Sequence, residues 1–180
     1  MEALWQGGEA DCSGKERFYT VSGTATITNG SVTNNRASAP GGYSDGGGFY
    51  NDGTVSFSAS NIAKNSAPGN GGGLFNADSG GSGTVSISNS TIVCNSASDK
   101  GGGGLFNIDD HGKTVMNISN STIASNSGGG GGGLYNEYDQ KVSIGGTIVA
   151  NRLRQLRWPY HRPGRQPGEQ NRHHQGLLTA

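Results

Sequence analysis

The chain has 180 residues, of which 34 are glycine and only 14% are charged. Its 13 basic and 13 acidic side chains give a formal net charge of zero, which argues against an extended disordered chain because such chains are strongly charged. The composition excludes a helical bundle, since glycine, serine, asparagine and threonine replace good helix formers throughout residues 22–151. No apolar run is long enough for a transmembrane helix.

Residues 1–23 match the rest of the chain only weakly, so we expect a divergent first coil or an N-terminal extension there. Leu4-Trp5-Gln6 stands where later segments carry Leu-Phe-Asn.

Two kinds of segment alternate along the rest of the chain up to residue 151. The first is glycine-rich and ends in asparagine, and its copies cover residues 46–51, 71–76, 102–107 and 131–136. The second alternates apolar with small polar residues, over residues 24–32, 54–62, 84–92, 114–123 and 142–148. Matching asparagines recur after 30, 30, 31 and 25 residues, at Asn35, Asn65, Asn95, Asn126 and Asn151. A near-constant period of this kind indicates stacked structural units.

The period-two alternation of the second segment predicts short strands, because successive side chains of a strand point to opposite faces. Each repeat has room for three strands of about four or five residues, and no linker is long enough for a helical crossover. We therefore expect residues 24–151 to form an all-β fold, a right-handed parallel β-helix of about five coils of three short strands.

Stacking places equivalent residues of successive coils above one another, so each layer of the core needs only a few apolar side chains. The predicted inward columns are Phe49, Leu74, Leu105 and Leu134; Ile27, Phe57, Ile87, Ile118 and Ile144; and Val32, Ile62, Ile92, Ile123 and Ile148. Cys94 is in phase with Ile92 and is expected in the core. Residues 114–118 contain one residue more than the equivalent strands, which predicts a β-bulge.

Asparagines form further columns, predicted to be ladders in which stacked amides bond one coil to the next. One ladder comprises Asn51, Asn76, Asn107 and Asn136, and the other comprises Asn29, Asn89 and Asn120. Asn89 and Asn120 also begin glycosylation sequons, but a buried structural role is the more economical interpretation.

The GGGLFN and GGGLYN segments, followed by segments such as TVSISNSTI, resemble the repeats of bacterial right-handed parallel β-helix proteins, including polymorphic outer-membrane-protein repeats of the pectin-lyase-like fold. The resemblance covers residues 46–151 well and residues 4–37 more loosely. It implies a secreted or cell-surface, adhesin-like scaffold that is a fragment of a larger protein, with a cell-surface glycan or a host or matrix surface as partner. Unlike secreted members, the chain begins without a recognisable signal peptide.

After residue 151 the composition changes abruptly. Residues 152–180 hold six of the eight arginines and carry a formal charge of +5, against −5 for residues 1–151. Two interpretations of this basic irregular segment are an arm that binds nucleic acid or lipopolysaccharide and a disordered tail without function. We favour a third interpretation, in which this segment is translated out of frame. Reading its codons in a shifted frame is compatible with the polar sequence that commonly follows the last strand in this family. No nucleic-acid partner is therefore expected.

Acidic residues gather in one inter-strand loop of each repeat, at Asp52, Asp78, Asp109, Asp110, Glu137 and Asp139. A Ca²⁺ or glycan site is one interpretation, and solvated turn residues are the one we favour, with no metal and no cofactor expected. The candidates for catalysis, as in a polysaccharide lyase or hydrolase, are Asp109, Asp110 and His111, with Lys113 nearby. They lie in a single insertion without matching carboxylates on rigid strands, so we expect a non-catalytic protein.

Four aromatic residues follow the members of the first inward column, so alternation turns them outward. Tyr50, Phe75, Phe106 and Tyr135 are therefore candidates for a ligand-binding stripe, with rings spaced about 5 Å apart and Trp5 extending the row. The interpretation we favour is packing under the neighbouring glycine-rich loops, because exposed apolar stripes are uncommon.

Overall fold

The computed structural model describes residues 2–10, 18–37, 44–77, 83–98, 101–108, 114–138, 140–151 and 156–157. Its strands are β1 (Glu2–Ala10), β2 (Phe18–Thr33), β3 (Phe49–Ser58), β4 (Asn61–Ala63), β5 (Ser66–Ala67), β6 (Leu74–Asn76), β7 (Thr84–Ser88), β8 (Thr91–Val93), β9 (Ser96–Ala97), β10 (Leu105–Asn107), β11 (Val115–Ser119), β12 (Thr122–Ala124), β13 (Leu134–Asn136), β14 (Lys141–Gly145), β15 (Ile148–Ala150) and β16 (Leu156–Arg157). Every strand pair among the described residues is parallel. The protein is a parallel β-solenoid, as the repeats predict.

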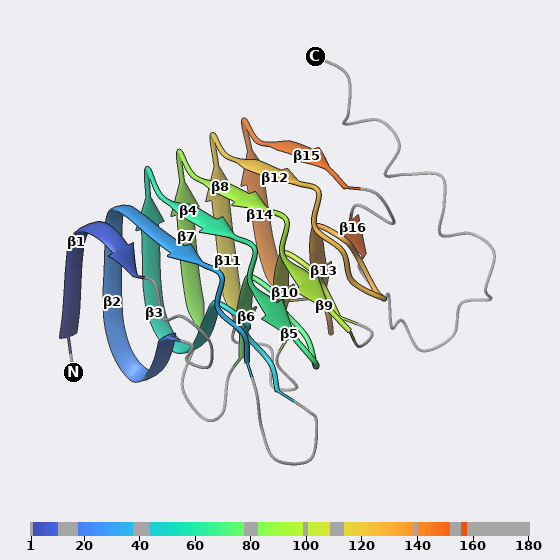
Figure 1. Cartoon of the computed structure of the whole chain (residues 1–180), viewed down its shortest axis with the longest axis horizontal. Coiled ribbons are helices and arrows are strands. Elements are labelled where there is room, and N and C mark those ends of the chain that lie inside the picture. Colours follow the sequence, from blue (N-terminus) through green and yellow to red (C-terminus); the bar gives the residue numbers. More distant parts are fainter. Residues whose placement is uncertain are drawn as a thin grey trace.

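The chain winds through three rows of paired strands, which are stacked along the long axis (Figure 1). Row I contains residues 2–6 of β1, residues 24–28 of β2, residues 54–58 of β3, and β7, β11 and β14. Row II contains residues 8–10 of β1, residues 31–33 of β2, and β4, β8, β12 and β15. Row III contains residues 18–21 of β2, residues 49–51 of β3, and β6, β10, β13 and β16. One turn passes from row III through row I to row II.

The number of turns is slightly lower than expected. Asparagine-to-asparagine hydrogen bonds connect Asn35, Asn65, Asn95, Asn126 and Asn151 in four steps, so four full turns lie between the first and the last.

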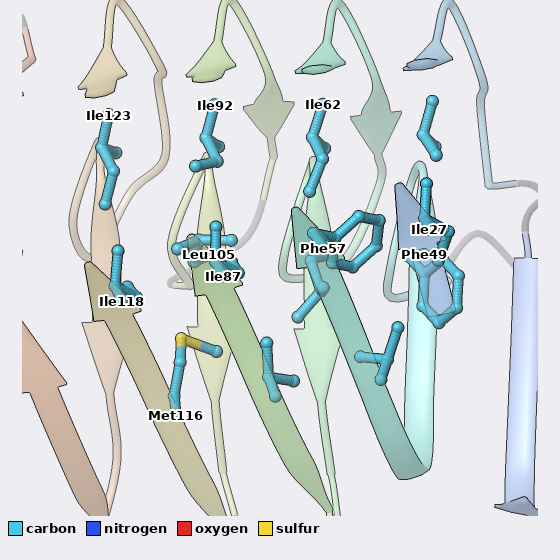
Figure 2. Close-up of a cluster of buried hydrophobic side chains, with 14 of the residues drawn as sticks. Ile27, Phe49, Phe57, Ile62, Ile87, Ile92, Leu105, Met116, Ile118 and Ile123 are labelled. Atoms are coloured by element: carbon cyan, nitrogen blue, oxygen red, sulfur yellow. The ribbon is translucent and has the colours of Figure 1, made fainter. Parts of the chain in front are cut away.

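The predicted core columns occupy the interior, with a single exception. Strand pairing places Leu74 between Phe49 and Leu105, and Ile92 between Ile62 and Ile123. The aligned isoleucines and the column headed by Ile27 are visible in Figure 2. In β7 the apolar residues are buried and the intervening serines are half-buried, which is the period-two pattern of a strand with one face on a core.

Ile148 is the exception, and its assignment to the core is wrong. Strand pairing places Val149, not Ile148, opposite Ile123, and the Ile148 side chain is 66% exposed. From the row I isoleucine to the final asparagine, the last repeat has one residue fewer than the repeat before it. Aligning Ile148 with Ile123 requires the missing residue to lie in the turn before β15. In the structure this turn is complete, with Gly146 at φ 57° and the Thr147 hydroxyl donating to the carbonyl oxygen of Gly145 at 3.0 Å. The strand is therefore shifted by one position, which reverses the faces of its side chains.

The β-bulge predicted in residues 114–118 is also absent from this strand. β11 pairs with β7 in unbroken register, with Val115 opposite Thr84 and Met116 in the core opposite Val85. Thr114 precedes the strand and is buried, so the additional residue is accommodated before β11 begins. A register shift occurs instead between β2 and β3, at Val21 to Thr24.

Two turn positions correct further expectations. Asn29, Asn89 and Asn120 are exposed and adopt positive φ angles of 53°, 50° and 48°, so they form a row of corner residues rather than a buried ladder. Cys94, at φ 56°, is exposed as well and does not belong to the core. The strand ends one residue before Asn89, Asn120 and Cys94, and Asn29 has the same backbone conformation within β2. This left-handed conformation breaks the alternation from which burial was inferred.

The first strand lies in a different row from the one suggested by its sequence. Leu4 and Trp5 pair with Thr26 and Ile27, so they belong to row I. The residues that pair with Phe49 and Tyr50 in row III are Phe18 and Tyr19, and β2 therefore begins before the expected boundary at residue 24. Among the described residues there is no helix with the length and hydrophobicity needed to span a bilayer. Leu156 and Arg157 of the basic tail extend row III beside β13.

Candidate functional site

The corner between row III and row I is where the repeats differ most in length. The row III strands end at Asn51, Asn76, Asn107 and Asn136, and these four asparagines are fully buried. The following row I strands resume at Thr54, Thr84, Val115 and Lys141. Successive strands of row III are in register with one another, and so are successive strands of row I. The connections from row III to row I therefore start at adjacent residues and end at adjacent residues. We call this the loop-bearing corner.

The four asparagines form the ladder that the sequence predicts. The side-chain amide of Asn51 donates to Asn76 Oδ1 at 2.7 Å, and that of Asn76 donates to Asn107 Oδ1 at 2.7 Å. Asn107 continues the series to Asn136 Oδ1 at 2.9 Å. A carboxamide can do this because it carries both donors and an acceptor, so identical side chains can bond in an unbroken column.

Three of these amides also close the base of the loop that follows them. Asn51 Nδ2 donates to the carbonyl oxygen of Gly53 at 3.0 Å, and Asn76 Nδ2 donates to that of Gly83 at 3.0 Å. Asn136 Nδ2 makes the equivalent bond to the carbonyl oxygen of Gln140 at 2.9 Å. These bonds span two, seven and four residues respectively. Loops of different length are thus held on one common base.

The aromatic row lies beside this ladder and is covered. Adjacent rings of Tyr50, Phe75, Phe106 and Tyr135 stack with centroids 5.1 Å apart. The Phe75–Phe106 and Phe106–Tyr135 planes are within 3° and 2° of parallel. Ala77 and Ile108 pack against the stack, and Tyr135 is only 7% exposed. The ring faces contact one another, which supports the packing interpretation over a stripe open to sugars.

A second buried ladder was not predicted as such. Asn65 Nδ2 donates to Asn95 Oδ1 at 3.0 Å, and Asn95 Nδ2 donates to Asn126 Oδ1 at 3.0 Å. The ladder residues also bond main chain, as when Asn95 Nδ2 donates to the carbonyl oxygen of Ile62 at 2.9 Å. The signal was present in the sequence, because these asparagines define the constant period.

Hydroxyl side chains, not asparagines, connect the coils at the corner between rows I and II. The Ser60 amide donates to Ser90 Oγ at 3.0 Å, and the Ser90 amide donates to Ser121 Oγ at 3.1 Å. The Ser121 amide continues to Thr147 Oγ1 at 3.3 Å. The residue that follows each exposed corner asparagine is buried or half-buried, and it makes the hydrogen bond between coils at this corner.

The candidate catalytic residues Asp109, Asp110 and His111 lie outside the described residues, as do Lys113, Asp78 and Asp139. Of the remaining acidic candidates, Asp52 is buried and Glu137 is half-buried. Within the described ranges, no group of three or more His, Cys, Asp or Glu side chains is arranged to hold a metal ion.

Comparisons of the chain with protein-family models, with curated protein sequences and with solved structures found no match. The fold assignment therefore rests on the strand pairing of this chain.

Proposed function

We propose that this protein is a non-catalytic, adhesin-like scaffold, secreted or displayed on a cell surface, that presents recognition loops from the loop-bearing corner. The observation that carries this proposal is the pair of bonds made by the side-chain amides of Asn51 and Asn76. One bond holds the neighbouring coil and the other closes the loop, so loop sequence and length can change while the solenoid keeps its register. Binding residues are commonly found on loops held by such a rigid support.

The interior of the described solenoid is used for its own cohesion. Apolar columns and two asparagine ladders fill the space between the rows, and the aromatic stack forms a second, separate buried cluster. Recognition is therefore assigned to the loops. Their sequences are acidic, and a cell-surface glycan or a host or matrix surface is the proposed partner. Membership of the bacterial pectin-lyase-like or polymorphic outer-membrane-protein repeat families is part of this proposal and rests on the repeat motifs.

A loop replacement tests the proposal. Residues 109–113 are replaced by a glycine-serine linker of equal length, and binding to a glycan array and to immobilised matrix proteins is measured. The matched control replaces residues 38–43, which connect row II to row III at a different corner. We expect the first replacement to abolish binding and the control to retain it. Circular dichroism should show the same thermal transition in both proteins, because neither replacement touches a strand.

Binding that is absent from the unmodified protein, or that survives the replacement of residues 109–113, would contradict the proposal. Cleavage of a polysaccharide that is lost in Asp109→Asn or Asp110→Asn would establish the enzyme alternative instead.

A further inference from the structure

The asparagines of this protein fall into two groups that differ in burial and in the residues that follow them. The buried asparagines among the described residues are the members of the two ladders, Asn35, Asn51, Asn65, Asn76, Asn95, Asn107, Asn126 and Asn136. None of them has serine or threonine two positions later. The signal Asn-X-Ser or Asn-X-Thr, which marks an acceptor for N-linked glycans, begins instead at Asn29, Asn89, Asn117 and Asn120. All four of these side chains are exposed.

Three of the four exposed acceptors lie at the corner between rows I and II, which is the upper edge of the solenoid in Figure 1. The main chain is held there by the neighbouring coil. The Asn89 amide donates to the carbonyl oxygen of Ser119 at 3.1 Å, and the Asn120 amide donates to that of Gly145 at 2.9 Å. The side chains of Asn89 and Asn120 make no hydrogen bond within the described part of the chain. The fold therefore fixes the position of each side chain without using its amide group.

The corner does not require an asparagine. Ala59 and Gly146 occupy the same corner position in other coils, with φ angles of 48° and 57°. The third residue of the signal is also replaceable, because Thr91 pairs with Asn61 in the neighbouring coil. Neither the backbone conformation nor the strand pairing thus demands asparagine at one end of the signal and threonine at the other.

Asn117 provides independent support, because it lies within β11 and not at a corner. Its neighbours in row I are Ser86 and Ser143. Asn117 and Ser119 are both exposed, as expected for residues two apart in a strand, which share one face. The amide and the hydroxyl group of this signal are therefore presented to solvent on the same side of the sheet.

We propose that Asn89, Asn117 and Asn120, together with Asn29, are acceptors for N-linked glycans. The donor is a sugar activated as a diphosphate ester. Nδ2 of the asparagine forms a bond to the anomeric carbon of the sugar as the bond from this carbon to the diphosphate oxygen breaks. The diphosphate leaves with the bonding electron pair, and a base of the transferase takes the proton from Nδ2. A bulky, hydrophilic group of this kind belongs on an exposed side chain.

Glycans at Asn89 and Asn120 extend from a different edge of the solenoid than the proposed recognition loops. β7 passes from the loop-bearing corner to Asn89 through the five residues Thr84–Ser88. This is about 16 Å for an extended strand. The inference uses no residue of the loop-bearing corner, so it is tested separately from the proposed recognition function.

Site mapping tests the modification directly. The protein is isolated from its natural source, and the peptides that contain the four signals are measured by mass spectrometry. We expect an added mass of one or more sugar residues on Asn89, Asn117 and Asn120. Thr91→Asn introduces the residue that the neighbouring coil carries at this position. It should abolish modification of Asn89 and leave Asn117 modified.

Labelling of the folded protein tests whether exposure selects the acceptors. Unmodified protein, produced in a host without N-glycosylation, is incubated with a soluble N-glycosyltransferase and a nucleotide-activated hexose. The matched control is Ala97→Ser, which creates the same signal at the ladder residue Asn95, whose side chain is 1% exposed. We expect labelling of Asn89 and Asn120 and no labelling of Asn95.

Two synthetic peptides show that the fold causes this difference. A peptide of residues 86–93 and a peptide of residues 92–98 with Ala97→Ser should both be labelled. Circular dichroism should show that the Ala97→Ser protein is folded during the reaction.

Signal-containing peptides without added sugar in the protein from its natural source would overturn the proposal. So would folded protein in which Asn89 and Asn120 stay unlabelled while the peptides are labelled. Equal labelling of Asn95 and Asn89 in folded Ala97→Ser protein would also contradict it, because a buried ladder residue would then be as good an acceptor as an exposed one.

Discussion

At the scale of single residues, cohesion between coils depends on side chains that bond in two directions. Asn95 Oδ1 accepts from the amide and the side chain of Asn65 at 2.9 and 3.0 Å. Its Nδ2 donates to Ile62 in one neighbouring coil and to Asn126 in the other. Asn35, the first member of this ladder, donates to Asn65 Oδ1 at 3.0 Å, but its own Oδ1 is buried without a hydrogen-bond partner among the described residues.

We predict that Asn95→Ala lowers the free energy of unfolding by about 3 kcal/mol, because it removes several buried bonds and leaves the Asn65 amide without an acceptor. Asn35→Ala is the matched control and should lower it by about 1 kcal/mol, since it removes a single side-chain bond to the ladder. Urea denaturation followed by circular dichroism measures both values. Equal losses would show that the ladder bonds are not what distinguishes the two sites.

The glycine corners provide a second prediction at this scale. A Cβ added to Gly103 would lie 2.1 Å from the carbonyl oxygen and 2.2 Å from the carbonyl carbon of Ser127 in the next coil. These are main-chain atoms that cannot move without separating the coils, so Gly103→Ala should cost about 3 kcal/mol. Gly145→Ala, whose Cβ meets nothing within 4 Å, should change stability by less than about 0.5 kcal/mol. The melting temperatures of the two variants should differ clearly. Equal melting temperatures would mean that the backbone at the glycine corners can move to accommodate a Cβ atom.

At the scale of strands, turns determine which side chains are buried. Three successive turns from row I to row II contain one residue with positive φ followed by a serine, at Ala59-Ser60, Asn89-Ser90 and Asn120-Ser121. Gly146-Thr147 keeps this arrangement in the last coil, although the repeat is one residue short. The missing residue is accommodated after β15, where Asn151 follows Ala150 directly and still accepts from the Asn126 amide at 2.9 Å.

The register of β15 can be tested with two substitutions at adjacent positions. Val149→Ser should lower the free energy of unfolding by about 1 kcal/mol, because Val149 packs against the core. Ile148→Ser should have almost no effect, because this side chain is largely exposed. Both are measured by urea denaturation followed by circular dichroism. A larger loss for Ile148→Ser would mean that the strand pairs one residue out of this register.

At the scale of the whole molecule, stability is the sum of similar layers, each contacting only its neighbours. Asn65 and Asn95 are equivalent, and the residues that follow them, Ser66 and Ser96, pair directly in β5 and β9. A cut made between equivalent positions therefore removes one layer and rejoins matching ends.

We predict that deleting residues 66–95 gives a protein that still folds, with a β-type circular dichroism spectrum and a lower melting temperature. Deleting residues 66–80 removes part of one turn, puts every later strand out of register with its row and should prevent cooperative folding. A cooperative unfolding transition in the variant that lacks residues 66–80 would contradict the layered architecture. This variant loses fewer residues than the one that lacks residues 66–95, so the size of the deletion does not explain a failure to fold.

The sequence by itself determined the parallel stacking, the members of most core columns and the ladder that begins at Asn51, because these follow from a period repeated several times. The tertiary structure decided what happens where repeats differ or strands end. It placed the additional residue before β11, kept the turn before β15, turned Cys94 outward and set the aromatic rings face to face. The physical reason is that a repeat specifies which residues are equivalent, whereas the backbone angle at each corner and the contact with the next coil specify which way a side chain points.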